Sequence, residues 1–333
     1  MRHRELSTLA ILAIVFAVFA SMAPQLLEPD TIKTILRQVA PVAIAGAAIT
    51  LVMVAGSLDL SVGGTIALSG VIAASLAAGD ASIPVAMLGG VAVGGAIGLV
   101  NAGLVVGLRI SSVIATLGTL FVARGIAFII SEGRPQSVIP NAESFSAPGN
   151  GTSFGVPNPA WIMLAVVLLF WFMQRHTKVG RYAVAIGSNE SAARLSGIRV
   201  NRVRIFLFVA AGVAAGVSGV ILAGQFNGDP KIVEEGWEFA VIVAAVLGGT
   251  SLAGGRGSVI GTLIGALIVG VIASGLNILG VDRFWQFVVQ GGVLVAVVAI
   301  DDRIGPLRER LSERRRRAQP APPAPPAAGE ASA

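Results

Sequence analysis

Few side chains of this 333-residue chain are able to do covalent or metal chemistry. The chain has no cysteine and only two histidines, His3 and His176. Thiolate metal sites and multi-histidine sites are therefore excluded within one chain. The apolar segments also contain no paired carboxylates of the kind that general acid–base catalysis uses. We therefore expect no catalytic residue and no metal site, which disfavours an intramembrane enzyme.

The glycine-rich stretch Gly249–Gly257 resembles a nucleotide-binding loop only superficially. A Walker A loop needs lysine after its last glycine, because that lysine reaches the phosphates, and here Arg256 follows Gly255. A dinucleotide-binding fingerprint fails as well, since Ile260 stands where its third glycine belongs. We expect a tight turn between two apolar segments, and no nucleotide cofactor bound by this chain.

Two charged side chains stand within or beside apolar segments. Charge at membrane depth is costly and is often functional. Asp59, with Ser57, either caps the start of the following helix or takes part in function, and capping is the favoured interpretation. Arg124 either pairs inside a helical bundle with a carboxylate or a helix-end carbonyl, or has a functional role, and pairing is favoured. A single acid without a histidine partner makes a proton relay less plausible but does not exclude ion coupling.

The composition shows which elements position these groups. Hydrophobic residues make up 54% of the chain and charged residues 13%, against about 25% charged in soluble domains, and the mean hydropathy is +0.82. We predict an all-α polytopic membrane protein with about ten transmembrane helices. The ten apolar segments are 6–27, 34–57, 60–78, 83–108, 110–131, 159–174, 204–224, 239–253, 258–279 and 284–300. Segments 60–78 and 239–253 are rich in Gly, Ser and Thr and are candidates for short or re-entrant helices.

Charge placement predicts the orientation. With the N-terminus in the cytoplasm, 18 of the 24 Lys and Arg residues fall on the cytoplasmic side and five outside, as the positive-inside rule requires. We therefore expect both termini in the cytoplasm, and we attribute the net charge of +6 to this bias and not to nucleic-acid binding. The expected parts are a membrane domain at 1–303, with an external loop at 132–158 and an internal loop at 175–203, and a basic, then Pro/Ala-rich disordered tail at 304–333.

Glycines recur four residues apart along several segments, which predicts close helix–helix packing. These glycines are Gly90, Gly94 and Gly98, Gly103 and Gly107, Gly212 and Gly216, and Gly261 and Gly265. A faint internal repeat relates 101–107 with Gly118 to 274–280 with Gly291. Two related halves are typical of transporters.

Polar side chains within the apolar segments are the candidates for a translocation pathway. They are Asp59, Ser61, Asn101, Thr116, Asn277 and Gln286. Amides and hydroxyls suit the hydrogen bonding of sugars, and weak sites suit passage. For each of these groups, a hydrogen bond between helices is the alternative and the favoured interpretation.

Loop 175–203 contains a predicted short helix at 189–196. Asn189 is its expected N-cap, Glu190 lies in the first turn, and Gly197 ends it. Such a helix between two membrane spans is either a docking element or a connector on the membrane surface, and its residues alone leave both open.

Four stretches together carry a resemblance to a known family. They are 56–63 (GSLDLSVG), 114–119 (IATLGT) with Arg124-Gly125, 187–198 (GSNESAARLSGI) and 244–258 (AAVLGGTSLAGGRGS) leading to Gly261-Thr262. In these motifs and their order, the chain resembles the permease subunits of bacterial ABC sugar importers of the ribose type over about residues 35–300. The tail lies outside the resemblance.

The resemblance implies a type II ABC importer-like bundle in the bacterial inner membrane. It implies a homo- or heterodimer of permease subunits, two separate ABC ATPase subunits that bind ATP and magnesium, and a periplasmic or lipid-anchored sugar-binding protein. Loop 187–198 would be the coupling helix seated in the ATPase. Its implied coupling residues are Gly187, Asn189, Ala192, Ala193, Ser196 and Gly197. Permeases for branched-chain amino acids or nucleosides, or less plausibly an ion-coupled secondary transporter, remain the alternatives.

Overall fold

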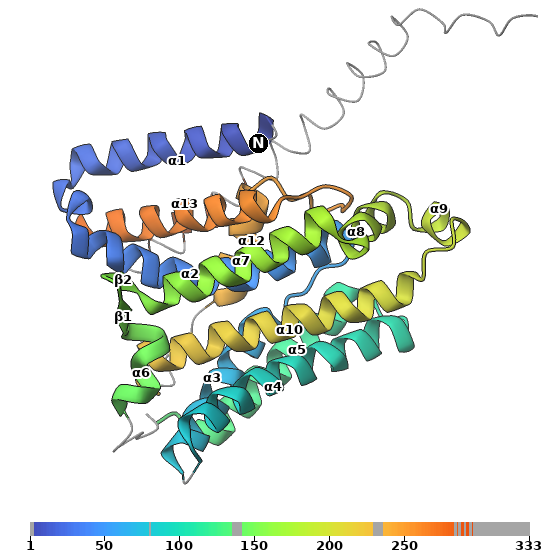
Figure 1. Cartoon of the computed structure of the whole chain (residues 1–333), viewed down its shortest axis with the longest axis horizontal. Coiled ribbons are helices and arrows are strands. Elements are labelled where there is room, and N and C mark those ends of the chain that lie inside the picture. Colours follow the sequence, from blue (N-terminus) through green and yellow to red (C-terminus); the bar gives the residue numbers. More distant parts are fainter. Residues whose placement is uncertain are drawn as a thin grey trace, which may run out of the picture. The chain divides into compact units, whose positions relative to one another are not determined.

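The computed structural model describes residues 3–79, 81–134, 142–228 and 236–282, together with 285, 288, 289, 291, 292 and 295. These residues form helices joined by short turns, with one two-stranded hairpin (Figure 1). The long helices are α1 (His3–Met22), α2 (Pro29–Val54), α3 (Val62–Ala78), α4 (Ile83–Ala102), α5 (Ser112–Ser131), α7 (Asn158–His176), α10 (Val200–Gln225) and α13 (Val259–Ile278). The shorter elements are η1 (Pro24–Leu27), η2 (Gly103–Gly107), α6 (Ala142–Asn150), β1 (Thr152–Ser153), β2 (Val156–Pro157), α8 (Lys178–Ser188), α9 (Glu190–Leu195) and α12 (Trp237–Leu247).

Seven of these helices are long and apolar enough to cross a membrane, which confirms an all-α polytopic membrane protein. They correspond to seven of the ten predicted segments. Segments 60–78 and 239–253 form α3 and α12, of 17 and 11 residues, which are too short to count among those seven. Most of the tenth segment, 284–300, lies outside the described residues, and the whole tail 304–333 does.

The core of the bundle is built on close glycine contacts, as the spacing predicts. Helix α10 packs against α4, α3 and α2. At the crossing of α4 and α10, a Cβ atom on Gly94 would overlap the carbonyl oxygen of Gly212, and one on Gly98 would overlap that of Phe208. In contrast, a Cβ atom on Gly103 or Gly107 would meet nothing within 4 Å. The packing prediction therefore holds at the α4–α10 crossing and not at η2.

The stretch Gly249–Gly257 is a turn between α12 and α13, as expected. Gly254 and Gly255 have φ values of +87° and +72°, which other residues rarely adopt. The Gly255 N–H donates to the Val54 carbonyl at the end of α2 over 2.9 Å. A Cβ atom on Gly187 would overlap that same carbonyl. The end of α2, the end of α8 and this turn therefore meet through backbone contacts.

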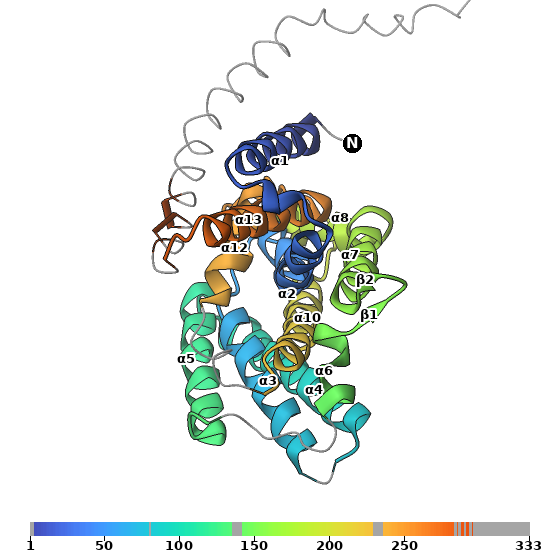
Figure 2. The same ribbon diagram turned by 90° about the vertical axis from the view of Figure 1, so that its left-hand side faces the viewer.

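The segment predicted as the external loop 132–158 is partly structured. Helix α6 packs against α10, and the Asn150 amide donates to the Gly224 carbonyl over 3.1 Å. The hairpin β1–β2 is antiparallel, with Thr152 opposite Pro157. At the other side of the bundle, α1 lies along α13 (Figure 2), with Phe19 against Gly275.

Candidate functional site

The short helix in loop 175–203 forms where the sequence predicts it. Helix α9 spans Glu190–Leu195, and the Asn189 side chain accepts a hydrogen bond from the Ala192 N–H over 2.9 Å. Gly197 adopts a φ of +78° just after the helix, which is the usual geometry of a helix stop. The predicted N-cap and the predicted end are both confirmed.

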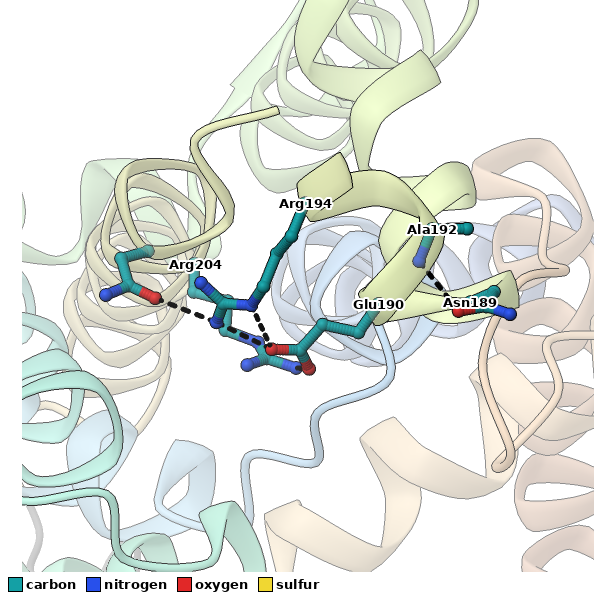
Figure 3. A network of polar contacts seen from close by, with 6 residues as sticks. Asn189, Glu190, Ala192, Arg194 and Arg204 are labelled. Carbon is teal, nitrogen blue, oxygen red and sulfur yellow. Dashed lines mark hydrogen bonds and ion pairs between the residues drawn. The ribbon is translucent and has the colours of Figure 1, made fainter. Parts of the chain in front are cut away.

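A polar network fixes α9 to the start of α10 (Figure 3). One carboxylate oxygen of Glu190 accepts from Arg194 over 2.7 Å, and the other accepts from Arg204 over 2.6 Å. Arg194 also donates to the Asn201 side chain over 3.2 Å. Burial alone would raise the pKa of the Glu190 carboxyl, but the hydrogen bonds from the two arginines outweigh burial and lower this pKa below 4.5. Glu190 is therefore ionised at neutral pH and holds α9 in a defined orientation.

The two faces of α9 differ in what they offer to a partner. Ala193 is 4% exposed and points into the protein, whereas Leu195 is 91% exposed. Ala192, Ser196 and Gly197 are exposed as well. Among the implied coupling residues, Ala193 therefore supports the helix from within. Leu195, which is not among the implied coupling residues, is the large apolar side chain that α9 presents outward. Its place within the predicted helix 189–196 was the only signal in the sequence.

A second polar network lies where the chain breaks between α2 and α3. Asp59 accepts hydrogen bonds from the Ser61 N–H and hydroxyl over 2.9 and 2.6 Å. The side-chain amide of Asn101 donates to the Ser61 hydroxyl over 2.7 Å. Its side-chain oxygen accepts from the Thr119 hydroxyl, also over 2.7 Å. Asp59 thus organises the residues just before α3, which begins at Val62. This geometry agrees with the favoured structural interpretation, although neither Asp59 nor Ser57 is the N-cap itself.

The same chain break is fastened to the first turns of α5. The Leu58 N–H donates to the Ser112 hydroxyl over 3.1 Å, and the Leu60 N–H donates to the Thr116 hydroxyl over 3.0 Å. Side-chain hydroxyls thereby satisfy backbone groups that no helix or sheet satisfies, which buried polar groups require.

Four of the six pathway candidates therefore belong to one network. Asp59, Ser61, Asn101 and Thr116 are all buried, so in this conformation they bind helices together and do not face an open passage. Asn277 lies apart, exposed near the end of α13. Gln286 lies outside the described residues.

A polar cavity of about 580 Å³ separates the two networks. Glu190, Arg194 and Arg204 line one side of it. Ser57 and Ser112, from the chain break and the start of α5, line another. Helix α9 and the break before α3 are therefore neighbours across one cavity.

One ion pair was not foreseen. Arg124 of α5 donates to both carboxylate oxygens of Glu238 over 3.0 and 3.3 Å. The expectation that Arg124 pairs inside the bundle is confirmed. Its partner Glu238, which immediately precedes the predicted segment 239–253, was not among the candidate residues. Within the described residues, no group of three His, Cys, Asp or Glu side chains could hold a metal ion.

Comparison with known proteins identifies relatives along most of the chain. The family model described as "Branched-chain amino acid transport system / permease component" matches residues 31–298. The ribose import permease protein of Escherichia coli strain K12 is 38% identical over 301 residues, which are 90% of this chain and 94% of that protein. No solved structure matches the chain.

Two further relatives are named for other sugars. The L-arabinose ABC transporter permease protein of Azospirillum brasilense is 37% identical over 292 residues, covering 87% of this chain and 85% of that protein. The D-allose transport system permease protein of Escherichia coli strain K12 is 37% identical over 296 residues, covering 88% and 90%. These matches confirm the resemblance that the four sequence motifs indicate.

Proposed function

The chain belongs to the family of permease components of ABC-type import systems, and we propose that it is the membrane-spanning subunit of an ATP-driven importer of a monosaccharide. The observation that carries this proposal is that relatives named for ribose, arabinose and allose each match almost the whole chain. Such a subunit is a transport component and not an enzyme. ATP and magnesium are bound by partner ATPase subunits.

The topology we propose has ten membrane segments in the bacterial inner membrane, in a type II importer-like bundle. The seven long apolar helices and the two short ones, α3 and α12, supply nine of these segments. Residues 284–300 supply the tenth. The positive-inside bias supports a cytoplasmic position for both termini and for loop 175–203.

In this topology α9 is the coupling helix that docks on an ATPase subunit. Two contacts support this role: α9 presents Leu195 outward, and the ion pair Glu190–Arg204 joins α9 to α10. Gly187 seats the end of α8 against α2. If α9 moves, α8 and α10 would therefore move with it as a rigid unit and shift the core helices that they contact.

The solute arrives on a periplasmic or lipid-anchored binding protein and passes between two permease subunits. The same family has a second candidate solute class, since its model is described for branched-chain amino acids. Calorimetric titration of the cognate binding protein with ribose, arabinose, allose, leucine and valine distinguishes the two classes. Binding of a monosaccharide supports the proposal, and binding of the amino acids alone contradicts it.

A further inference from the structure

The ion pair between Arg124 and Glu238 lies deep in the membrane domain. Arg124 is 12 residues after the start of α5, which places it about 18 Å along this 20-residue helix. Glu238 is in the first turn of α12. The glutamate side chain is 4% exposed, and that of the arginine is 23% exposed. Two charges at this depth are expensive, and such residues commonly mark the path of a solute or ion.

The carboxylate of Glu238 occupies space that a glycine leaves open. A Cβ atom on Gly63, in the first turn of α3, would overlap this carboxylate. The negative charge therefore lies at the N-terminal end of α3, where the helix dipole favours it. The beginnings of the two short helices, α3 and α12, thus meet at the ion pair.

This ion pair joins helices that otherwise pack in different groups. Helix α5 packs mainly against α3, whereas α12 packs mainly against α13 and α2 and has a smaller contact with α3. Because α5 and α12 share little other contact, their ion pair is able to break while each helix keeps its main neighbours. It has the form of a two-state element that a conformational cycle could switch.

The face of α5 that carries Arg124 is partly exposed. Phe121 and Phe128, one turn before and one turn after Arg124, lie on this face and are exposed. The partly exposed Arg124 side chain between them starts about 18 Å from one end of the helix and about 10 Å from the other. Contact with hydrocarbon at that depth is strongly unfavourable for arginine, so this face meets water or protein.

We propose that Arg124 and Glu238 form a gate in the translocation pathway, closed by their ion pair and opened when hydroxyl groups of the passing monosaccharide take over their hydrogen bonds. The gate rests on the proposed function, because it lies in the pathway of that importer. The guanidinium donates and the carboxylate accepts, so a vicinal diol satisfies both groups at once. Re-formation of the ion pair would then release the solute, which keeps the site weak enough for passage.

The chain contains no cysteine, so single cysteines report on this gate directly. We would introduce Phe121→Cys and Phe128→Cys separately, reconstitute each with its ATPase and binding protein, and add a membrane-impermeant thiol reagent from the external side. In the resting complex we expect labelling at position 128 and none at position 121. Leu169→Cys, exposed on the apolar face of α7, is the lipid-facing control and should stay unlabelled.

Opening of the gate is tested in the same assay. The ion pair is removed in two variants, the single substitution Glu238→Gln and the double substitution that combines Arg124→Gln with Glu238→Gln. We expect each to increase external labelling of Phe121→Cys about tenfold or more, because a buried ion pair is strongly weakened by loss of a charge. Addition of ATP and sugar-loaded binding protein should increase the external labelling of Phe121→Cys in the complex that keeps the ion pair. Retention of the ATPase during purification verifies that each variant is assembled.

Two results would overturn the gate. One is that neither cysteine reacts with the impermeant reagent in any state, which means that lipid or the second subunit covers this face. The other is that labelling of Phe121→Cys is unchanged by loss of the ion pair in assembled complexes. The labelling experiment tests whether the gate exists, whereas uptake assays test which solute is transported. Failure of the gate is therefore distinguishable from failure of the proposed function.

Discussion

The carboxylate of Glu190 in α9 accepts a hydrogen bond from the guanidinium of Arg204 in α10 over 2.6 Å, and this contact ties a short loop helix to a membrane-spanning helix. The same carboxylate also holds Arg194 within α9. This contact therefore links α9 directly to α10, which packs against α2, α3 and α4 at the centre of the bundle.

Removal of this tie should uncouple transport from ATP hydrolysis. We expect Glu190→Gln to lower the number of solute molecules imported per ATP hydrolysed, because neither Arg194 nor Arg204 keeps a charged partner. Both rates are measured on the same reconstituted vesicles. Glu143→Gln, an exposed substitution in α6, is the control. An unchanged ratio in Glu190→Gln would show that the ion pair has no part in coupling.

Leu195 should determine docking of the ATPase. Leu195→Asp places a charge on the exposed apolar position of α9, and we expect the ATPase to be lost when the complex is purified. Leu195→Ala should give an intermediate loss, and Arg181→Ala, exposed on α8, should have none. Ala193→Arg is less informative, since Ala193 is buried within this chain. Full retention of the ATPase by Leu195→Asp would contradict docking through α9.

The orientation of α9 should not change with pH in the physiological range. The folded-state pKa of Glu190 is lowered below 4.5, so its stabilising effect is complete above that value and is lost as pH falls through the folded-state pKa. A spin label at Ser191→Cys should show constant mobility from about pH 8 to about pH 5, and greater mobility only once the pH falls through the lowered pKa of Glu190. In Glu190→Gln the label should be mobile throughout. A mobility change near neutral pH in the parent would contradict the assignment.

Close packing between α4 and α10 should make Gly94 intolerant of a side chain. We expect Gly94→Ala to destabilise the protein by about 1–3 kcal/mol, since its methyl group overlaps the Gly212 carbonyl. Gly103→Ala meets open space and should have little effect on stability. Thermal unfolding in detergent compares the two. Equal melting temperatures would mean that the α4–α10 contact is looser than described.

The network at the break before α3 should contribute to stability through Asn101. Asn101→Ala leaves the hydroxyls of Ser61 and Thr119 without this partner, and we expect a loss of about 1–3 kcal/mol. Asn277→Ala removes an exposed amide and should be nearly neutral. If the two variants unfold at the same temperature, the network is not a stabilising element.

Patterns local in sequence predicted the architecture well. The hydropathy windows matched the seven long helices, and Asn189 and Gly197 predicted both ends of α9 because caps depend on neighbouring residues. Glycine spacing predicted close helix packing, which is found where α4 meets α10. It did not predict that Gly103 and Gly107 lack such contacts, since spacing alone does not show whether a partner helix is opposite.

Contacts between distant segments were beyond the sequence. Arg124 and Glu238 are 114 residues apart, so pairing required the fold to bring the two short helices α3 and α12 together at α5. The outward direction of Leu195 and the inward direction of Ala193 depend on how α9 is rotated, which Glu190 and Arg204 determine. For Asp59, Ser61, Asn101 and Thr116, hydrogen bonds between helices were the favoured interpretation. That these four residues share one network depends on the fold and was not predicted.

ATP-dependent uptake of a labelled monosaccharide tests the central claim most directly. The chain is reconstituted in vesicles with its ATPase subunits, ATP is enclosed on the ATPase side, and the sugar-loaded binding protein is added on the other side. We predict accumulation of the sugar only when ATP, the ATPase and the binding protein are all present. Accumulation driven by an ion gradient without the ATPase would contradict the account.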